Sequence, residues 1–351
     1  MCYNRISLGK WGKQGKQGKQ GKWEFSVFFF FLLCVFPVKA QQTASSMNLK
    51  GNVRILYTYS HVAKDITVKD NNQVSYNKVK LMKHIDYIFD KNGLLLAENR
   101  FNNEDIINIS YIYDYNELGK LIEETTAEAG KFQLGREEYK YDKNGRKSHK
   151  TIYDDRDSLK HTIIYSYDSL GNLSAEKTYN KIIGITKEIH YKYDERGNLI
   201  FVNYPRMNIA KNKPSHEIQK FDNRNNLIYK SFTKDDTLIW EYTAHYNKKD
   251  SLIYEEVKDG NGKITSYSKL EFKKDKRTSL IQFNKASITE TYYQYDKKGN
   301  LLIETQYTAN KKDLIKIRTY LYDEKENWIY CIELNSNNGT SVVHSRKINY
   351  F

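Results

Sequence analysis

The chain has 351 residues, a formal net charge of +14, 30 Tyr, and only 3 Pro and 3 Cys. Two of the cysteines, Cys2 and Cys34, lie in the first 40 residues. An internal disulfide in the remainder is therefore excluded, and stability must come from packing. Abundant Tyr and scarce Pro favour long, uninterrupted sheet pairing.

Residues 1–40 have the features of a secretory signal peptide. A Lys-rich lead runs from Lys10 to Lys22, the stretch Phe25–Val38 is almost wholly apolar, and Ala40 is a small residue before Gln41. The apolar stretch is about 14 residues, whereas a spanning helix needs about 20, so a signal anchor is the less favoured reading. The sequence predicts export to the periplasm, the cell surface or the exterior.

Removal of residues 1–40 takes away seven Lys or Arg and one Glu, which lowers the net charge from +14 to +8. A modest positive charge spread over the remaining residues is typical of a soluble, Lys-rich β surface. Acidic partners such as lipopolysaccharide or nucleic acid are the less favoured interpretation, and we expect no nucleic-acid partner. Residues 41–86 are predicted to be N-terminal cap strands, of which Leu49 to Tyr59 is the clearest.

Residues 87–351 contain a motif that recurs about every 26 residues. Its clearest copy is Tyr191–Leu199, with the sequence YKYDERGNL. The second aromatic falls at residues 89, 115, 141, 167, 193, 221, 246, 272, 295 and 322. A motif that keeps phase over this distance indicates a tandem structural repeat. Val342 to Phe351 is predicted to be the closing strand.

Each part of the motif has a structural reason. The two aromatic rings are two residues apart, so they share one face of a strand. Asp followed three residues later by Gly predicts a tight turn, because Asp accepts backbone N–H bonds and Gly tolerates positive φ. At the Gly position, Asn225 and Asp250 fit, whereas Lys276 and Glu326 fit poorly. The motif Leu opens the return strand.

Strict alternation along these strands predicts one apolar and one polar face. Leu173, Ala175, Lys177 and Tyr179 are expected on one face, and Leu301, Ile303, Thr305 and Tyr307 repeat the pattern. The face opposite the tyrosines is expected to carry Lys192, Glu176, Glu304, Gln294 and Ser166.

The predicted fold is all-β, with tandem antiparallel hairpins forming about 20 to 22 strands. Open sheets rarely exceed about ten strands, so this one should curve into a spiral, a flattened barrel or a long twisted sandwich. We expect its apolar face to pack on itself about 10 Å away. An outer-membrane barrel is the rival, but the polar face predicted above argues against a lipid-facing band.

The pattern Tyr-x-Tyr-Asp-x-x-Gly-x-Leu resembles the tyrosine–aspartate (YD, or Rhs) repeats of bacterial surface and toxin-delivery proteins. The resemblance covers about residues 87–351 and implies a β-hairpin shell and export. Large members of that family wind their hairpins around a toxin. This chain lacks their Asp-Pro-rich self-cleaving end and a C-terminal toxin, so the resemblance is to a short form.

A search for chemistry predicts no catalytic, cofactor-binding or metal-binding residues. The eight His form no His-x-x-x-His pair, and no Cys-x-x-Cys pair is present. Asp154–Asp157 and Asp259–Gly262 superficially suggest calcium, but turn chemistry explains them better. Glu124, Glu176 and Glu304 recur three residues after the motif Leu. Glycosidase chemistry is the less favoured explanation of these carboxylates, and exposed cross-strand pairing with Lys is the favoured one.

The favoured function is therefore an exported, non-enzymatic scaffold that binds a protein or a surface at the cell envelope, without a cofactor or stable membrane insertion. A carbohydrate-binding module that uses exposed tyrosines is the first alternative, and the outer-membrane barrel is the second. An enzyme with a site in the irregular stretch 206–216 is the third. The ligand, the partner and the oligomeric state are left open.

Overall fold

The computed structural model describes residues 43–68, 73–128, 133–207, 215–284, 287–309, 313–336 and 339–351. All of these belong to one compact unit, residues 41–351. The predicted signal peptide lies outside the described residues, as does most of the stretch 206–216.

The described residues form 22 strands and no α-helix. Most strands have seven to ten residues, whereas the first two have 16 each. Their bounds are β1 Val53–Val68, β2 Val74–Phe89, β3 Leu95–Phe101, β4 Ile107–Tyr115, β5 Leu121–Glu128, β6 Gln133–Tyr141, β7 Lys147–Tyr153, β8 Leu159–Tyr167, β9 Leu173–Asn180, β10 Gly184–Tyr193, β11 Leu199–Met207, β12 Ser215–Phe221, β13 Leu227–Lys234, β14 Thr237–Tyr246, β15 Leu252–Asp259, β16 Ile264–Lys273, β17 Lys276–Asn284, β18 Ser287–Tyr295, β19 Leu301–Thr308, β20 Leu314–Tyr322, β21 Trp328–Asn335 and β22 Ser341–Tyr350.

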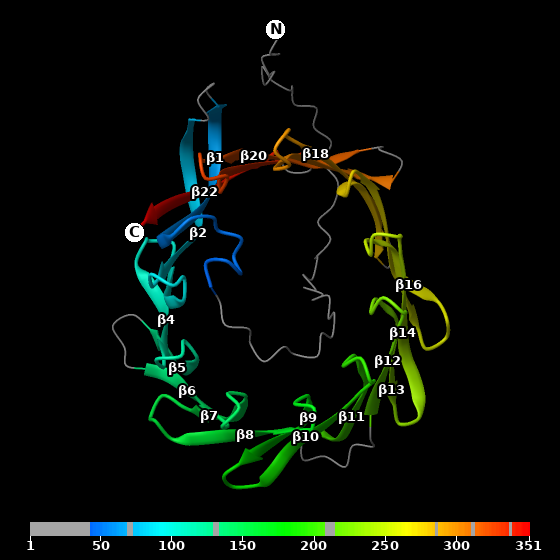
Figure 1. Cartoon of the computed structure of the whole chain (residues 1–351). Helices are drawn as coiled ribbons and strands as arrows, with labels where there is room; N and C mark the ends of the chain where they lie inside the picture. The colour runs from blue at the N-terminus through cyan, green and yellow to red at the C-terminus, as the bar shows by residue number, and fades with distance from the viewer. Residues whose placement is uncertain are drawn as a thin grey trace, which may run out of the picture. The chain divides into compact units, whose positions relative to one another are not determined.

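The strands close into one barrel. Each strand pairs antiparallel with the next along the chain, as β4 does with β5. β22 pairs in turn with β1, from Tyr350 opposite Val53 to Ser341 opposite Ala63. Figure 1 shows the resulting ring, in which the red end of the chain lies beside the blue one. The all-β prediction is confirmed, and the arrangement is an up-and-down barrel.

The motif Asp organises most of the motif turns, as predicted, and Asn116 and Asn247 take the same role in two others. In the turn after β6, Asp142 Oδ1 accepts the backbone N–H of Asn144 at 2.9 Å and of Arg146 at 2.8 Å. Gly145 follows with φ of +73° and donates its N–H to the Asp142 carbonyl. Asp154 and Asp259 accept equivalent pairs of N–H bonds, so both act as turn residues.

Several turns depart from the glycine rule, and Asn225 and Asp250, which were expected to fit, adopt φ of +66° and +59°. Glu326 adopts φ of +63° at the fourth position, so a non-glycine residue occupies the left-handed conformation there. After β16 the turn is shorter and consists of Lys274 and Asp275, both with positive φ, as in a two-residue hairpin. Lys276 is therefore the first residue of β17 and needs no positive φ.

A β-bulge follows these turns and changes which side chains share a face. Tyr115 lies opposite Leu121, but Asp114 lies opposite Glu123, so the return strand holds one extra residue. Glu124 consequently lies opposite Tyr113. The same shift occurs between β8 and β9 and between β18 and β19.

These bulges correct the expected distribution of side chains. Strict alternation placed Glu176 and Glu304 opposite the tyrosines, whereas the structure pairs them with Tyr165 and Tyr293 on the tyrosine face. Ala175 then lies opposite Ser166, on the face away from Leu173. The expectation that Glu124 is an exposed strand residue is also wrong, because it is only 5% exposed.

The tyrosine face is the inner face of the barrel. Residues 43–50 lie inside the ring in Figure 1, and Ala44 and Leu49 pack with Phe89, Tyr113 and Tyr139. At about 4.8 Å per strand, 22 strands give a perimeter of about 105 Å and a diameter of about 34 Å before tilt. Side chains on opposite walls cannot meet across this width. The predicted packing of this face on itself is therefore replaced by a wall that curves around an interior.

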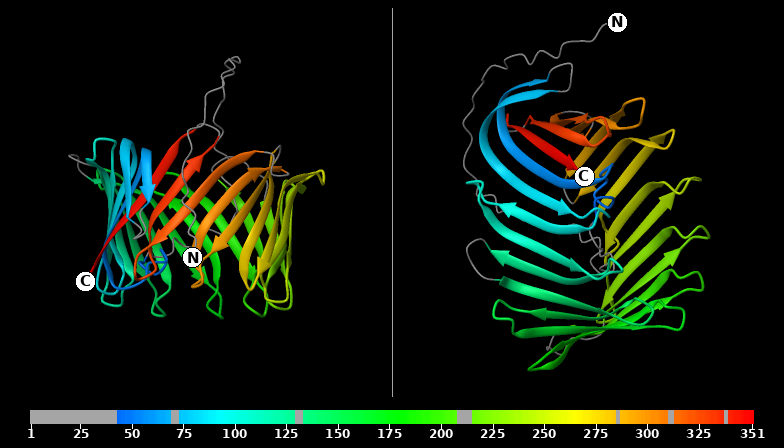
Figure 2. Two further views of the ribbon diagram at one scale, coloured as in Figure 1. Left: turned by 90° about the horizontal axis from the view of Figure 1, so that it is seen from above. Right: turned by 60° about the vertical axis from the view of Figure 1, so that its left-hand side comes forward.

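The long β1–β2 hairpin covers part of the outer face. Beyond Ala63, β1 no longer pairs with β22. We call residues 64–68 and 73–78 the strap. Its Ile66 and Tyr76 pack on Ile332 and Val343, which are only 6% and 0% exposed. Figure 2 shows the blue hairpin bending over the red strands. The strap thereby shields the outer apolar face next to the junction between the chain ends.

The turn carboxylates predict an acid-dependent stability. The hydrogen bond from Lys160 and then the Ser158 N–H lower the pKa of Asp154 to about 2. Such a group stabilises the fold above its unfolded pKa of about 3.9, and this stabilisation is lost as the pH falls toward 2. We expect the urea midpoint to fall over this range, and less steeply in Asp154→Asn. The control Asp155→Asn should match the parent, and a D154N profile equal to the parent would contradict this role.

Candidate functional site

The candidate functional site is the inner wall, and its repeating unit is a pair of tyrosines. The second Tyr of five motifs is anchored to the preceding repeat. Tyr141 Oη donates to the Leu121 carbonyl at 2.7 Å, and Lys120 lies over the Tyr141 ring, 5.2 Å from its centroid. Tyr115, Tyr167, Tyr246 and Tyr322 donate to the equivalent carbonyls. These bonds join consecutive repeats and fix the orientation of the rings.

We expect this hydrogen bond to make a measurable contribution to the free energy of unfolding in each repeat that has it. Tyr141→Phe should lower the free energy of unfolding by about 1 kcal/mol, because it leaves the Leu121 carbonyl without its donor. The control is Tyr193→Phe, since no such bond is seen for Tyr193 among the described residues. Chemical denaturation measures both variants. Equal losses for the two would show that the hydroxyl bond contributes nothing.

Several tyrosines of the inner wall, whether in the motif like Tyr191 or on a return strand like Tyr204, donate to a carboxylate. Tyr191 Oη lies 2.9 Å from Glu176, and Tyr204 Oη lies 2.8 Å from Glu217. Burial, and then the neighbouring carboxylate, raise the pKa of Tyr191 well above its usual range. Burial also raises the pKa of Glu176. These hydroxyls therefore stay protonated at neutral pH and act as hydrogen-bond donors.

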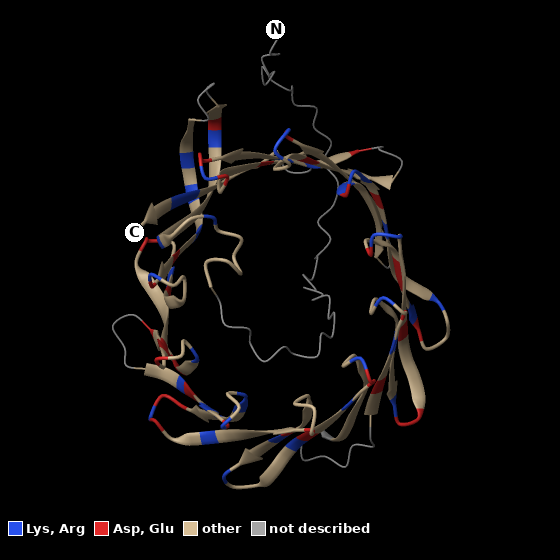
Figure 3. Cartoon of the chain, viewed as in Figure 1, with Lys and Arg blue, Asp and Glu red and all other residues tan. Residues whose placement is uncertain are grey.

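Cations on the same wall balance further carboxylates. Lys230 Nζ lies 2.7 Å from Glu217, in a pair whose side chains are 9% and 2% exposed. Lys150 pairs with Glu137 at 2.8 Å, and Arg318 contacts Glu333 at 2.6 Å and Glu304 at 3.2 Å. Figure 3 shows both signs of charge around the whole ring. The wall is thus aromatic and polar, with its charges matched locally.

Residues 43–50 lie against one sector of this wall. The Ala44 N–H donates to the Gly93 carbonyl at 2.9 Å, and Thr43 forms a β-bridge with Leu94. Under this segment Leu95 is 0% exposed and Leu121 is 7% exposed. At the same position of other repeats Leu173, Leu199, Leu227, Leu252 and Leu301 are half-buried. The segment therefore covers a site that the other repeats offer more openly.

The side chain of Asn327 joins residues 43–50 to the last strand. Asn327 is 2% exposed. Its amide oxygen accepts the Lys50 N–H at 2.7 Å, and its amide nitrogen donates to the Lys50 carbonyl and to Tyr350 Oη, both at 2.9 Å. Tyr350 Oη in turn donates to Asp323 at 3.0 Å. The last motif turn, the segment just before β1 and the last strand are thus joined at one side chain.

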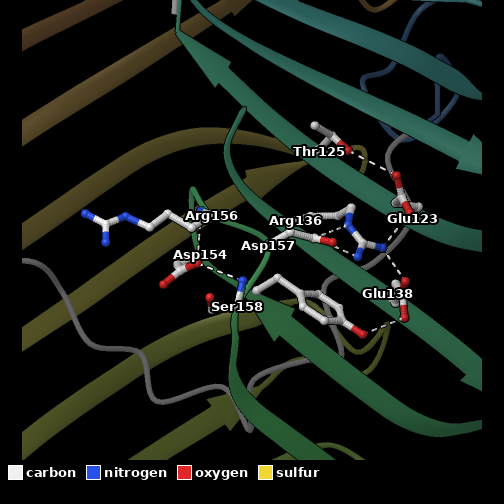
Figure 4. Close-up of polar contacts among 9 residues, drawn as sticks. Glu123, Thr125, Arg136, Glu138, Asp154, Arg156, Asp157 and Ser158 are labelled. Carbon is white, nitrogen blue, oxygen red and sulfur yellow. Dashed lines mark hydrogen bonds and ion pairs between the residues drawn. The ribbon is translucent and has the colours of Figure 1, made fainter. Parts of the chain in front are cut away.

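The outer face also carries ion pairs between strand residues. Arg136 lies three residues before Tyr139 on β6 and therefore points outward. Its guanidinium contacts Glu138, lies 3.0 Å from Glu123, and lies 2.8 Å from Asp157 (Figure 4). Lys177 and Glu188 pair at 3.1 Å farther along the outer face. This part of the outer face suits contact with water.

The structure brings together residues that the sequence had not singled out as a site. Glu98, Glu137 and Glu217 line the inner wall beside the recurring Glu124, Glu176 and Glu304. The sequence signal for this row of carboxylates was the Glu three residues after the motif Leu. An odd spacing places two residues on opposite faces of a regular strand, so Leu and Glu can share the inner face only across an irregular step. Among the described residues no group of three or more His, Cys, Asp or Glu could hold a metal.

No helix with the length and apolarity needed to span a bilayer occurs in the part of the chain that the structure describes.

Comparison with known proteins gives only structural likenesses. No model of a known protein family matches the chain. No curated protein matches it either.

The solved structures similar to this chain include two crystal structures of TcdB2–TccC3. One has 10% identity and a TM-score of 0.29, and covers 81% of this chain and 19% of that one. The other lacks the hypervariable C-terminal region and has 11% identity and a TM-score of 0.28, with 83% and 20% covered. A porin-like protein from Bacteroides uniformis has 9% identity and a TM-score of 0.29, with 86% and 99% covered. The chain spans about a fifth of the length of the TcdB2–TccC3 chains.

Proposed function

We propose that this protein is an exported β-barrel scaffold whose inner wall holds a short polypeptide segment. The observation that carries the proposal is the position of residues 43–50 on that wall. The segment is held by a backbone bond to Gly93 and by contacts of Ala44, Met47 and Leu49 with wall residues. Backbone pairing and small apolar contacts accept many sequences. The wall is therefore suited to a turn-forming segment with small apolar side chains, as residues 44–48 are.

The remaining repeats extend this surface around the barrel. Leu227 repeats the position of Leu121, and Tyr246 donates to its carbonyl at 3.1 Å, as Tyr141 does to Leu121. Leu227 is half-buried, whereas Leu121 is 7% exposed under residues 43–50. The same apolar and aromatic groups are thus available to a second chain away from the first segment.

We further propose that the protein acts by binding and not by catalysis. The carboxylates of the wall are engaged with tyrosine hydroxyls and cations, as Glu176 is with Tyr191 and Glu217 is with Lys230. A carbohydrate-binding role is less favoured, because it needs exposed ring faces. Every tyrosine that the structure describes is buried or half-buried.

A labelled peptide with the sequence of residues 43–52, TASSMNLKGN, tests the proposal. Fluorescence anisotropy should show saturable binding to the purified exported protein. Leu199→Glu combined with Leu227→Glu should weaken binding by about tenfold or more, because charge enters an apolar contact. The matched control Ile218→Glu changes an outer-face residue that is 37% exposed and should leave affinity unchanged. Absence of binding, or equal losses from inner and outer changes, would refute the proposal.

An outer-membrane barrel is the second candidate, favoured by closure with an even number of strands. Outward residues such as Ile112 and Ile122 are also 44% and 39% exposed. The Arg136 cluster opposes lipid contact, because a cation near the bilayer midplane costs about 2–4 kcal/mol. Residues 41–351 should therefore stay monodisperse without detergent in size-exclusion chromatography. Recovery only in detergent would favour the membrane barrel.

A further inference from the structure

A cavity of about 330 Å³ lies on the outer face, away from the inner wall. Tyr59 and His61 of β1 line it on one side, and residues 78–81 of β2 line it where the strap begins. Asn103, Glu104 and Asp105 of the β3–β4 turn complete it. Register shifts in the β1–β2 pairing fall at these positions, between Ser60 and His61 and between Val62 and Ala63. Such bulges redirect side chains and are frequent next to binding sites.

The cavity carries opposite charges from different elements. Lys78 and Lys80 are exposed on β2, and Glu104 is exposed on the turn. Within the described ranges no ion pair engages either of these ammonium groups or the Glu104 carboxylate. Asp105 is held in place by a hydrogen bond with His84 Nδ1, which fixes the turn against β2. The arrangement therefore presents cationic and anionic groups to the same volume.

His61 adds an unused hydrogen-bonding group to the wall of this cavity. Its side chain is 6% exposed, and its Nδ1 is shielded without a hydrogen-bond partner among the described residues. Burial, and then the charge of Lys78, lower the pKa of His61, so the ring is neutral at neutral pH. The Tyr59 ring stacks on His84, with centroids 4.2 Å apart, and forms a fixed aromatic side of the site.

We propose that this cavity binds a small zwitterionic ligand of the free amino-acid class. Its carboxylate would lie toward Lys78 and Lys80, its ammonium toward Glu104 and Asp105, and its side chain against Tyr59, Val79 and Leu81. A simple anion is disfavoured by the two carboxylates, and a simple cation by the two ammonium groups. The volume is at the lower end of the range for small-molecule sites, which suits a molecule of this size. The proposal is independent of the inner wall.

Isothermal titration of the purified protein with L-leucine and its two half-ligands tests the proposal. 4-Methylpentanoate lacks the ammonium, and 3-methylbutan-1-amine lacks the carboxylate. L-leucine should bind saturably, and each half-ligand should bind about tenfold more weakly or worse, because one charged contact is lost. A panel of the other standard amino acids then ranks the side-chain preference. Absence of saturable binding across this panel, or equal binding of the half-ligands, would overturn the proposal.

Matched variants distinguish loss of a contact in the cavity from a general effect of changing the charge of the protein. Lys80→Gln and Glu104→Gln should each weaken binding of the best amino acid by about tenfold. His61→Phe keeps a buried ring, removes both nitrogens and should also weaken binding. Lys143→Gln and Glu195→Gln change exposed turn residues remote from the cavity and should bind as the parent does. Circular dichroism confirms that each variant is folded, and unchanged affinity in both K80Q and E104Q would refute the site.

Discussion

Asn327→Ala should lower the free energy of unfolding by about 2–4 kcal/mol, because it removes three hydrogen bonds from a nearly buried group. The Lys50 backbone would lose both of its partners at this side chain, and Tyr350 would lose a donor. Since Lys50 lies just before β1 and Tyr350 ends β22, the loss should fall on the junction that closes the barrel. Urea denaturation measures the change.

Asn300→Ala is the matched control for this substitution. Asn300 occupies the same turn position in the preceding motif, and among the described residues its side-chain amide bonds only to Asp296, at 3.0 Å. Asn300→Ala should lower the free energy of unfolding by about 1 kcal/mol or less. Hydrogen exchange should also show faster exchange in β1 and β22 of N327A than in β10 and β11. Equal destabilisation by the two variants would show that Asn327 acts only as a turn residue.

Lys230→Met should destabilise the barrel by about 3–5 kcal/mol, because it leaves the Glu217 carboxylate buried without its cation. Glu217 is 2% exposed, and its other partner is the Tyr204 hydroxyl at 2.8 Å. Glu217→Gln added to Lys230→Met should recover most of the loss, because a neutral amide can still accept the tyrosine bond. Thermal and urea denaturation of the single and double variants measure both effects.

Lys249→Met controls for the loss of a lysine as such. Lys249 pairs with Asp275 at 2.8 Å, but the two side chains are 67% and 64% exposed. Its replacement should change stability by less than about 1 kcal/mol. If K230M and K249M lost the same stability, burial of the inner pair would not be the reason for the larger expected effect.

Most of the fold follows from the repeat in the sequence. The second aromatic of the motif ends β4 at Tyr115, β6 at Tyr141 and β10 at Tyr193, and the Asn or Asp after each makes the turn. These features are local, because two rings two residues apart and a following Asp define one strand end. Their spacing was therefore sufficient to predict the hairpins and the number of strands.

Closure and the side-chain distribution could not be predicted in the same way. Closure pairs β22 with β1 and brings Asn327 into contact with Lys50, two residues separated by 277 positions that share no pattern. The bulge after the turn adds one residue, so alternation along the return strand assigns Glu176 to the wrong face. Alternation identifies faces only where the ladder is regular, and the irregular step recurs in each of these hairpins.

The antiparallel junction between β1 and β22 restricts how a barrel of this kind can change in size. Every connection reverses the chain direction, so the first and last strands meet antiparallel only when the total is even. Duplication or loss of one 26-residue unit adds or removes two strands and alters the perimeter by about 10 Å, with the junction preserved. A change of one strand would bring the ends together running the same way. Gene duplication can therefore enlarge such a ring only in steps of one hairpin.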